Sequence, residues 1–240
     1  MRSLEVLALM AALLVAGSIH QALQPQPALP GAPTRYPIVL VHGLLAGPRS
    51  FSKVQAAIAR DGHRVFVPAL PPVHDVPARA RYLVEQIDRV LATTGAGKVN
   101  LVAHSMGGLD ARYLVSALGY ADRVASISTV GTPHRGMPLA DRLLRWTRGR
   151  SAAALDRLAV QTGRRFVEPA LAEVASFRAG FAAVSQAAAE AFNAAHPDAP
   201  GVYVQSWAGF SRLGRGGAEP DACRGEAPLI RARGADRSRT

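Results

Sequence analysis

Residues 99–108 have the sequence Val99-Asn100-Leu101-Val102-Ala103-His104-Ser105-Met106-Gly107-Gly108. An apolar run comes first and predicts a buried strand, and a turn of small residues leads into a predicted helix over about Met106–Leu118. This pattern is typical of a nucleophile elbow, in which a serine occupies a strained turn and small residues flank it two positions away. Ala103 stands where glycine is more usual, and alanine is small enough to serve. The pattern therefore predicts that Ser105 is a nucleophile.

Two backbone N–H groups are expected to lie beside this serine. The first belongs to Met106, at the start of the predicted helix, where the helix dipole favours an anion. The second follows a buried strand predicted over Ile38–Val41, because Gly43 lets the backbone turn sharply and direct the N–H of Leu44 toward the same point. Leu44 and Met106 are therefore predicted to form an oxyanion hole.

The histidines are interpreted as structural residues. In sites of this kind the general base follows the nucleophile in the chain, and His42 precedes it, so His42 is predicted to shape its loop. His104 points to the opposite side of its strand and is expected to be packed and hydrogen-bonded. His134 is expected to hold a loop in place. The remaining loop histidines, His63 and His74, are predicted to be solvated.

The rest of the sequence alternates between short β-branched runs and helical stretches, which indicates βαβ units and a parallel sheet. Further strands are predicted over Val65–Val67, Val124–Val130 and Val202–Trp207, and further helices over Phe51–Arg60 and Ala78–Ala92. Residues of about 136–200 have helical spacing without a convincing strand, which predicts a helical insertion. We expect an α/β core over residues 36–210, followed by an irregular basic tail over 211–240.

The first 23 residues resemble a targeting segment. An apolar run, Val6–Gly17, follows Arg2, although Glu5 cancels much of the positive charge before it. The run is too short for a membrane span and fits a signal peptide or a short signal anchor, with a buried helix as the alternative. A proline-rich linker over residues 24–35 follows. The sequence thus predicts a secreted or periplasmic protein, or one anchored in the inner membrane.

The composition excludes some partners. The formal net charge is +11, and all but two of the 28 basic side chains are arginines. They are scattered, without a basic helix or interleaved aromatic residues, so nucleic-acid binding is not expected. The only cysteine is Cys223, which excludes an internal disulfide.

Four motifs in this order resemble the secreted bacterial triacylglycerol lipases of the α/β-hydrolase superfamily: Tyr36–Leu45, Val99–Gly108, Ser126–Gly136 and Gly201–Gly209. The resemblance implies an α/β-hydrolase fold with a mostly parallel sheet, Ser105 as nucleophile, and Leu44 and Met106 as oxyanion-hole donors. It also implies a lid within the helical insertion, a lipid or ester substrate at a lipid–water interface and, for some relatives, a folding chaperone. The chemistry requires no metal or organic cofactor.

The resemblance also implies an aspartate and then a histidine after the last predicted strand. After Trp207 the sequence has Glu219, Asp221, Glu226 and Asp236 but no histidine, and Asp221 is the nearest substitute acid by position. His134 and His196 follow the serine but precede that strand. We therefore expect a C-terminally incomplete fold, by truncation or a shift of reading frame. The calcium ligands of such lipases would also be missing, so no metal is expected.

Three functions remain open at this point. The first is a carboxylic ester hydrolase, most specifically a triacylglycerol lipase acting through an acyl-enzyme at Ser105. The second is an inactive α/β-hydrolase fragment that keeps an acyl pocket without turnover. The third is an acyltransferase, which would share the same elbow.

Overall fold

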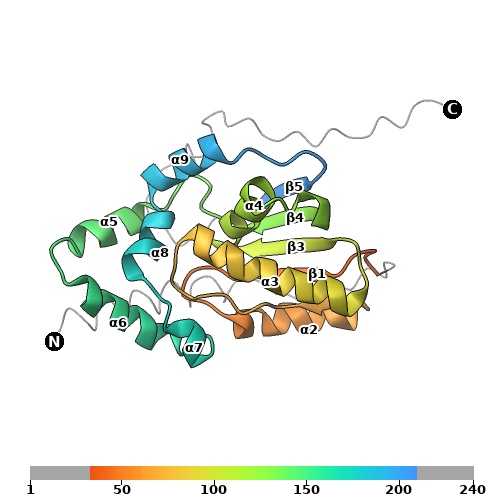
Figure 1. Ribbon diagram of the computed structural model, residues 1–240, viewed down its shortest axis with the longest axis horizontal. Helices are drawn as coiled ribbons and strands as arrows, with labels where there is room; N and C mark the ends of the chain where they lie inside the picture. Colours follow the sequence, from red (N-terminus) through yellow and green to blue (C-terminus); the bar gives the residue numbers. More distant parts are fainter. Residues whose placement is uncertain (1–32, 210–240) are drawn as a thin grey trace. The chain divides into compact units, whose positions relative to one another are not determined.

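Five parallel strands form the centre of the computed structural model, which describes residues 33–209 (Figure 1). Their order is β2-β1-β3-β4-β5, and every neighbouring pair is parallel. The strands are β1 (Ile38–Val41), β2 (Val65–Phe66), β3 (Val99–His104), β4 (Val124–Val130) and β5 (Tyr203–Trp207). Each strand end lies within one residue of its predicted place, and the expected α/β class with a parallel sheet is confirmed. The predictions for the apolar N-terminal run, Asp221 and Cys223 fall outside the described residues.

The main helices of the core connect the strands. They are α2 (Ser52–Arg60), α3 (Val76–Thr94) and α4 (Gly107–Ala117), with short 3-10 turns η1 (Pro48–Phe51) and η2 (Ala121–Arg123). Helix α3 begins where the Asp75 carboxylate accepts a hydrogen bond from the Ala78 N–H at 2.8 Å, and ends at Gly95, which has φ +66°. Helices α3 and α4 pack together on one face of the sheet, where alternate residues of β3 are buried against them.

Five helices lie between β4 and β5, as the helical spacing predicted: α5 (Pro138–Trp146), α6 (Ala152–Gly163), α7 (Pro169–Ala172), α8 (Phe177–Ala183) and α9 (Gln186–Ala195). Helices α5 and α6 both pack against α8. The inner faces of these helices share one apolar cluster with Leu44, Leu45 and Met106. The insertion therefore packs directly on the residues predicted to surround the nucleophile. Between residues 33 and 209, no helix combines the length and the apolarity that crossing a membrane requires.

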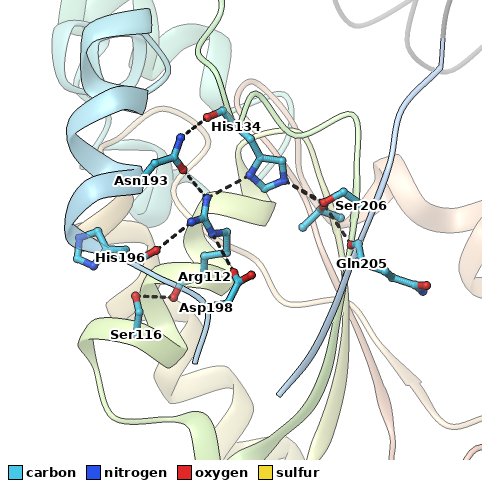
Figure 2. A network of polar contacts seen from close by, with 9 residues as sticks. Arg112, Ser116, His134, Asn193, His196, Asp198, Gln205 and Ser206 are labelled. Atoms are coloured by element: carbon cyan, nitrogen blue, oxygen red, sulfur yellow. Dashed lines mark hydrogen bonds and ion pairs between the residues drawn. The ribbon is translucent and has the colours of Figure 1, made fainter. Parts of the chain in front are cut away.

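A polar network centred on Arg112 joins the end of this insertion to the sheet (Figure 2). From α4, the Arg112 guanidinium donates to the Asn193 side-chain oxygen at 2.8 Å, to the His196 carbonyl at 2.9 Å and to His134 Nδ1 at 3.3 Å. The Asn193 amide in turn donates to the His134 carbonyl at 2.7 Å. Helix α9 is therefore tied to both α4 and the loop after β4.

The position of the proton on His134 follows from these contacts. Because a guanidinium can only donate, His134 Nδ1 must accept, and the neutral ring carries its proton on Nε2. Nε2 lies 3.1 Å from the Thr129 hydroxyl and 3.3 Å from the Ser206 hydroxyl, which connects the ring to β4 and β5. Burial, and then the charge of Arg112, lower the pKa of His134 to about 4. His134 thus holds its loop in place, as predicted.

This geometry predicts a pH-dependent contribution to stability. Because the pKa of His134 is about 4 in the folded chain and near 6.5 when unfolded, the unfolded chain binds more protons between these values. The contribution of His134 should be fully present above pH 6.5 and be lost as the pH falls toward 4. In urea unfolding measured across this range, the stability advantage of the wild type over His134→Gln should shrink with falling pH. A constant difference would contradict the assigned neutral ring.

Candidate active site

Ser105 lies at the turn between β3 and α4 with φ +53°, a left-handed conformation that residues other than glycine rarely adopt. Both of its backbone groups are held by hydrogen bonds. Its N–H donates to the Val130 carbonyl at 2.9 Å, and its carbonyl accepts from the Thr132 hydroxyl at 2.8 Å. This strained strand-to-helix turn has the geometry of a nucleophile elbow.

The turn needs glycine at three positions around Ser105. A Cβ on Gly107 would come within 2.5 Å of the Val41 carbonyl oxygen, and one on Gly108 would overlap the Thr132 hydroxyl. A Cβ on Gly43 would lie 2.7 Å from the Cβ of Ser105. The end of β1 and the loop after it therefore press directly against the elbow, and only glycine backbones fit between them.

The loop after β1 places Leu44 beside the elbow. Leu45, with φ +53°, donates its N–H to the Pro72 carbonyl at 2.8 Å, and the Leu70 N–H donates to His42 Nε2 at 3.1 Å. Within residues 33–209, no acceptor contacts the backbone N–H of Leu44 or that of Met106. Both N–H groups therefore remain free to donate, which an oxyanion hole requires.

His42 is fully buried and shapes this loop. Because its Nε2 accepts from Leu70, its Nδ1 carries the proton and donates to the Gly43 carbonyl at 3.1 Å. Burial, followed by the charge of Arg79, lowers the pKa of His42 to about 3. A ring that stays neutral and is hydrogen-bonded on both sides agrees with the predicted loop-shaping role.

A buried ion pair holds the same loop from behind. Arg79 of α3 and Asp110 of α4 are both completely buried, and Nε and Nη2 of Arg79 lie 2.9 and 2.8 Å from Oδ2 of Asp110. Arg79 also donates to the His42 carbonyl at 2.6 Å and to the Pro71 carbonyl. Burial raises the pKa of Asp110 to about 6, and the charge of Arg79 opposes the rise. The pair joins both helices to the backbone next to Gly43.

Sequence reasoning did not identify Arg79 or Asp110. A signal was present, since Arg79 lies four residues before Leu83 on the apolar side of its helix, and Asp110 lies between apolar residues of the elbow helix. Charged residues on an apolar helix face are almost always paired when buried. Two such residues on neighbouring predicted helices pointed to a buried ion pair.

None of the histidines in the described part of the chain contacts the Ser105 hydroxyl. His134 is held in the Arg112 network, and the ring of His196 packs against Phe192 and Tyr113 at centroid distances of 4.7 and 4.9 Å. His104 lies half-buried, and residues 33–209 offer its ring no hydrogen-bond partner, contrary to the expectation. No three His, Cys, Asp or Glu side chains gather within this range in a way that could hold a metal ion.

The ion pair predicts an asymmetric effect of substitution. Arg79→Met leaves a buried carboxylate without its partner and should lower the free energy of unfolding by about 3–5 kcal/mol. Adding Asp110→Leu removes that charge and should recover part of the loss, because only the Pro71 and His42 carbonyls then lack a donor. The control Arg89→Met breaks an exposed pair with Glu85 and should cost at most about 0.5 kcal/mol.

Urea unfolding of the single and double variants measures these differences. A double variant no more stable than Arg79→Met would contradict the assigned role of the pair.

Comparison with known proteins places this geometry in a family. The chain is 42% identical to a triacylglycerol lipase of Vibrio cholerae over 113 residues, which covers 45% of this chain and 36% of the relative. It is 38% identical to a triacylglycerol lipase of Pseudomonas fragi over 157 residues, which covers 63% of this chain and 48% of the relative. The chain thus spans less than half the length of each of these curated relatives.

Solved structures agree on the fold. A metagenomic carboxyl esterase superposes with a TM-score of 0.58 at 20% identity, over 79% of this chain and 56% of that protein. The mature lipase of Bacillus licheniformis superposes with a TM-score of 0.54 at 20% identity, over 73% of this chain and 66% of that protein. The family model described as alpha/beta hydrolase fold matches residues 36–166. Since that match covers more than half of the chain, the protein belongs to the alpha/beta hydrolase family.

Proposed function

We propose that this chain carries the nucleophile and oxyanion hole of a carboxylic ester hydrolase, most specifically a triacylglycerol lipase. The observation that carries the proposal is Ser105 in a left-handed turn between the unpaired N–H groups of Leu44 and Met106. The likeness to triacylglycerol lipases supports the substrate class. We also propose that the protein is exported and acts at a lipid–water interface, and that a lipase folding chaperone assists it.

In this mechanism the Ser105 hydroxyl oxygen attacks the ester carbonyl and forms a tetrahedral intermediate. The developing oxyanion accepts hydrogen bonds from Leu44 and Met106, at the N-terminal end of α4. The alcohol then leaves with a proton, and water releases the acid from the acyl-enzyme. A base must take the Ser105 proton first. Among residues 33–209, no histidine contacts that hydroxyl.

We propose that helices α5–α9 act as the lid. The support is the apolar cluster that residues of α5, α6, α8 and α9 share with Leu44 and Met106. A movement of these helices would expose apolar side chains to an acyl chain and uncover the site.

A second function is favoured by one observation. If no base reaches Ser105, the chain is an acyl-binding module without turnover, and the absence of a histidine contact within the described residues favours this alternative. An acyltransferase would share the elbow and would pass the acyl group to an alcohol rather than to water.

Labelling by a fluorophosphonate probe separates these functions. We expect the purified chain to be labelled and to release p-nitrophenol from acyl esters, and Ser105→Ala to abolish both, because the probe bonds only to an activated serine. Turnover without labelling would disprove Ser105 as nucleophile, and neither signal would favour the binding module. Ester formation from an added alcohol, in place of free acid, would identify an acyltransferase.

The oxyanion loop gives an independent prediction. Gly43→Ala would place a Cβ 2.7 Å from that of Ser105, so the loop must move and carry Leu44 away. Since loss of one oxyanion donor costs about 100-fold or more in rate, the labelling rate should fall by about that factor. The matched control is Gly97→Ala, whose Cβ meets no atom within 4 Å and should label normally. Equal labelling rates in the two variants would contradict the assignment of the Leu44 N–H as an oxyanion-hole donor.

A further inference from the structure

The first two helices of the insertion form the most basic segment of the described chain. Residues 138–165 hold seven arginines and two aspartates, a formal charge of +5. All seven arginines are exposed: Arg142, Arg145, Arg148, Arg150, Arg157, Arg164 and Arg165. The segment therefore presents positive charge to the solvent along α5 and α6.

The two aspartates bond to backbone N–H groups rather than to these arginines. The Asp156 carboxylate accepts a hydrogen bond from the Phe177 N–H at 2.8 Å, and the Asp141 carboxylate accepts one from the Gln186 N–H at 3.3 Å. Among the partners that the structure describes, only Arg164 of the seven pairs with a carboxylate, that of Glu173. Outside this segment, the exposed Arg60, Arg89 and Arg123 each lie beside an acid.

Four of these arginines lie within four residues of an exposed tryptophan in the sequence. Trp146, at the end of α5, is 40% exposed, and the Arg150 guanidinium lies 4.3 Å from the centroid of its ring. Arg142 and Arg145 precede it at helical spacing, and Arg148 follows it. We call these five residues, 142, 145, 146, 148 and 150, the arginine–tryptophan patch.

The opposite side of the same helix is apolar. Ala140 and Leu143 are buried in the cluster that contains Met106 and Leu44. Helix α5 thus packs its apolar face into that cluster, and the arginine–tryptophan patch lies along its exposed side and just after its C-terminal end (Figure 1 shows the helix).

We propose that the arginine–tryptophan patch docks on a membrane surface rich in anionic phospholipid. Guanidinium groups bind phosphate through paired donors, and tryptophan settles at the boundary between headgroups and acyl chains. An anionic membrane surface attracts several basic residues at once. Each of these residues raises the affinity of the protein for the membrane about fivefold. Docking would bring the membrane to α5, one of the helices proposed above to act as the lid, and this part of the inference rests on the proposed function.

This inference does not depend on turnover and is tested on a chain that cannot react. The Ser105→Ala variant is mixed with vesicles of phosphatidylcholine, with or without phosphatidylglycerol, and bound protein is separated by sedimentation. We expect binding to the anionic vesicles only, with an affinity that falls as salt is added. Arg142→Gln with Arg145→Gln should weaken that binding by about 25-fold.

The matched control removes two exposed arginines from α3, by Arg81→Gln with Arg89→Gln, and should leave vesicle binding nearly unchanged. Tryptophan fluorescence gives a second readout in a Trp207→Phe background, where Trp146 is the only remaining tryptophan. Its emission should shift to the blue when anionic vesicles are added. Circular dichroism of every variant checks that it is folded.

Three results would overturn the proposal. They are equal binding to neutral and anionic vesicles, equal losses in the patch and control variants, and an unchanged emission of Trp146 on binding. A soluble polyanion such as polyglutamate that bound as tightly as the vesicles would assign the patch to an acidic polymer instead. A failure of the chain to hydrolyse esters would leave these vesicle-binding results unchanged. Ester hydrolysis and membrane docking are therefore tested separately.

Discussion

The left-handed backbone of Ser105 is the constraint on which the rest of the site depends. A residue held in this region costs about 1–3 kcal/mol, so its surroundings must fix it in place. Val130 and Thr132 do so by hydrogen bonds to its N–H and its carbonyl. This close packing leaves no room for a Cβ at three positions. Glycines therefore stand at 43, 107 and 108. One strained residue thereby determines sequence in two separate segments.

Buried arginines connect the layers behind this turn. Arg79 bonds to Asp110 and also to backbone carbonyls of the loop that precedes Leu44. Arg112 likewise holds the end of the insertion, because it donates a hydrogen bond to the His196 carbonyl. In both cases the planar guanidinium, with several donors in a fixed geometry, joins elements far apart in the sequence. Lysine has three donors on one nitrogen and lacks this planar geometry, which spreads the donors over three nitrogens.

The strands and the elbow could be predicted because their signals are local. The largely apolar run before Ser105 and the two glycines at 107 and 108 specify strand, turn and helix within ten positions. The sequence shows the Arg79–Asp110 pair only as two charged residues on apolar helix faces, and the packing of α3 on α4 identifies them as partners. The hydrogen-bond partners of His134 could not be predicted from the sequence either, because they lie on four different helices and strands. The expected hydrogen bond of His104 was inferred from residue type alone.

The connection between β4 and β5 has a consequence for the order of folding. These strands are neighbours in the sheet, yet residues 131–202 and five helices separate them in the chain. Closing so long a connection delays pairing, because contacts distant in sequence form late and slow the reaction. During synthesis the edge of β4 that pairs with β5 therefore stays unpaired until the ribosome has released the whole insertion. In that interval β4 is an open template for strands of other chains.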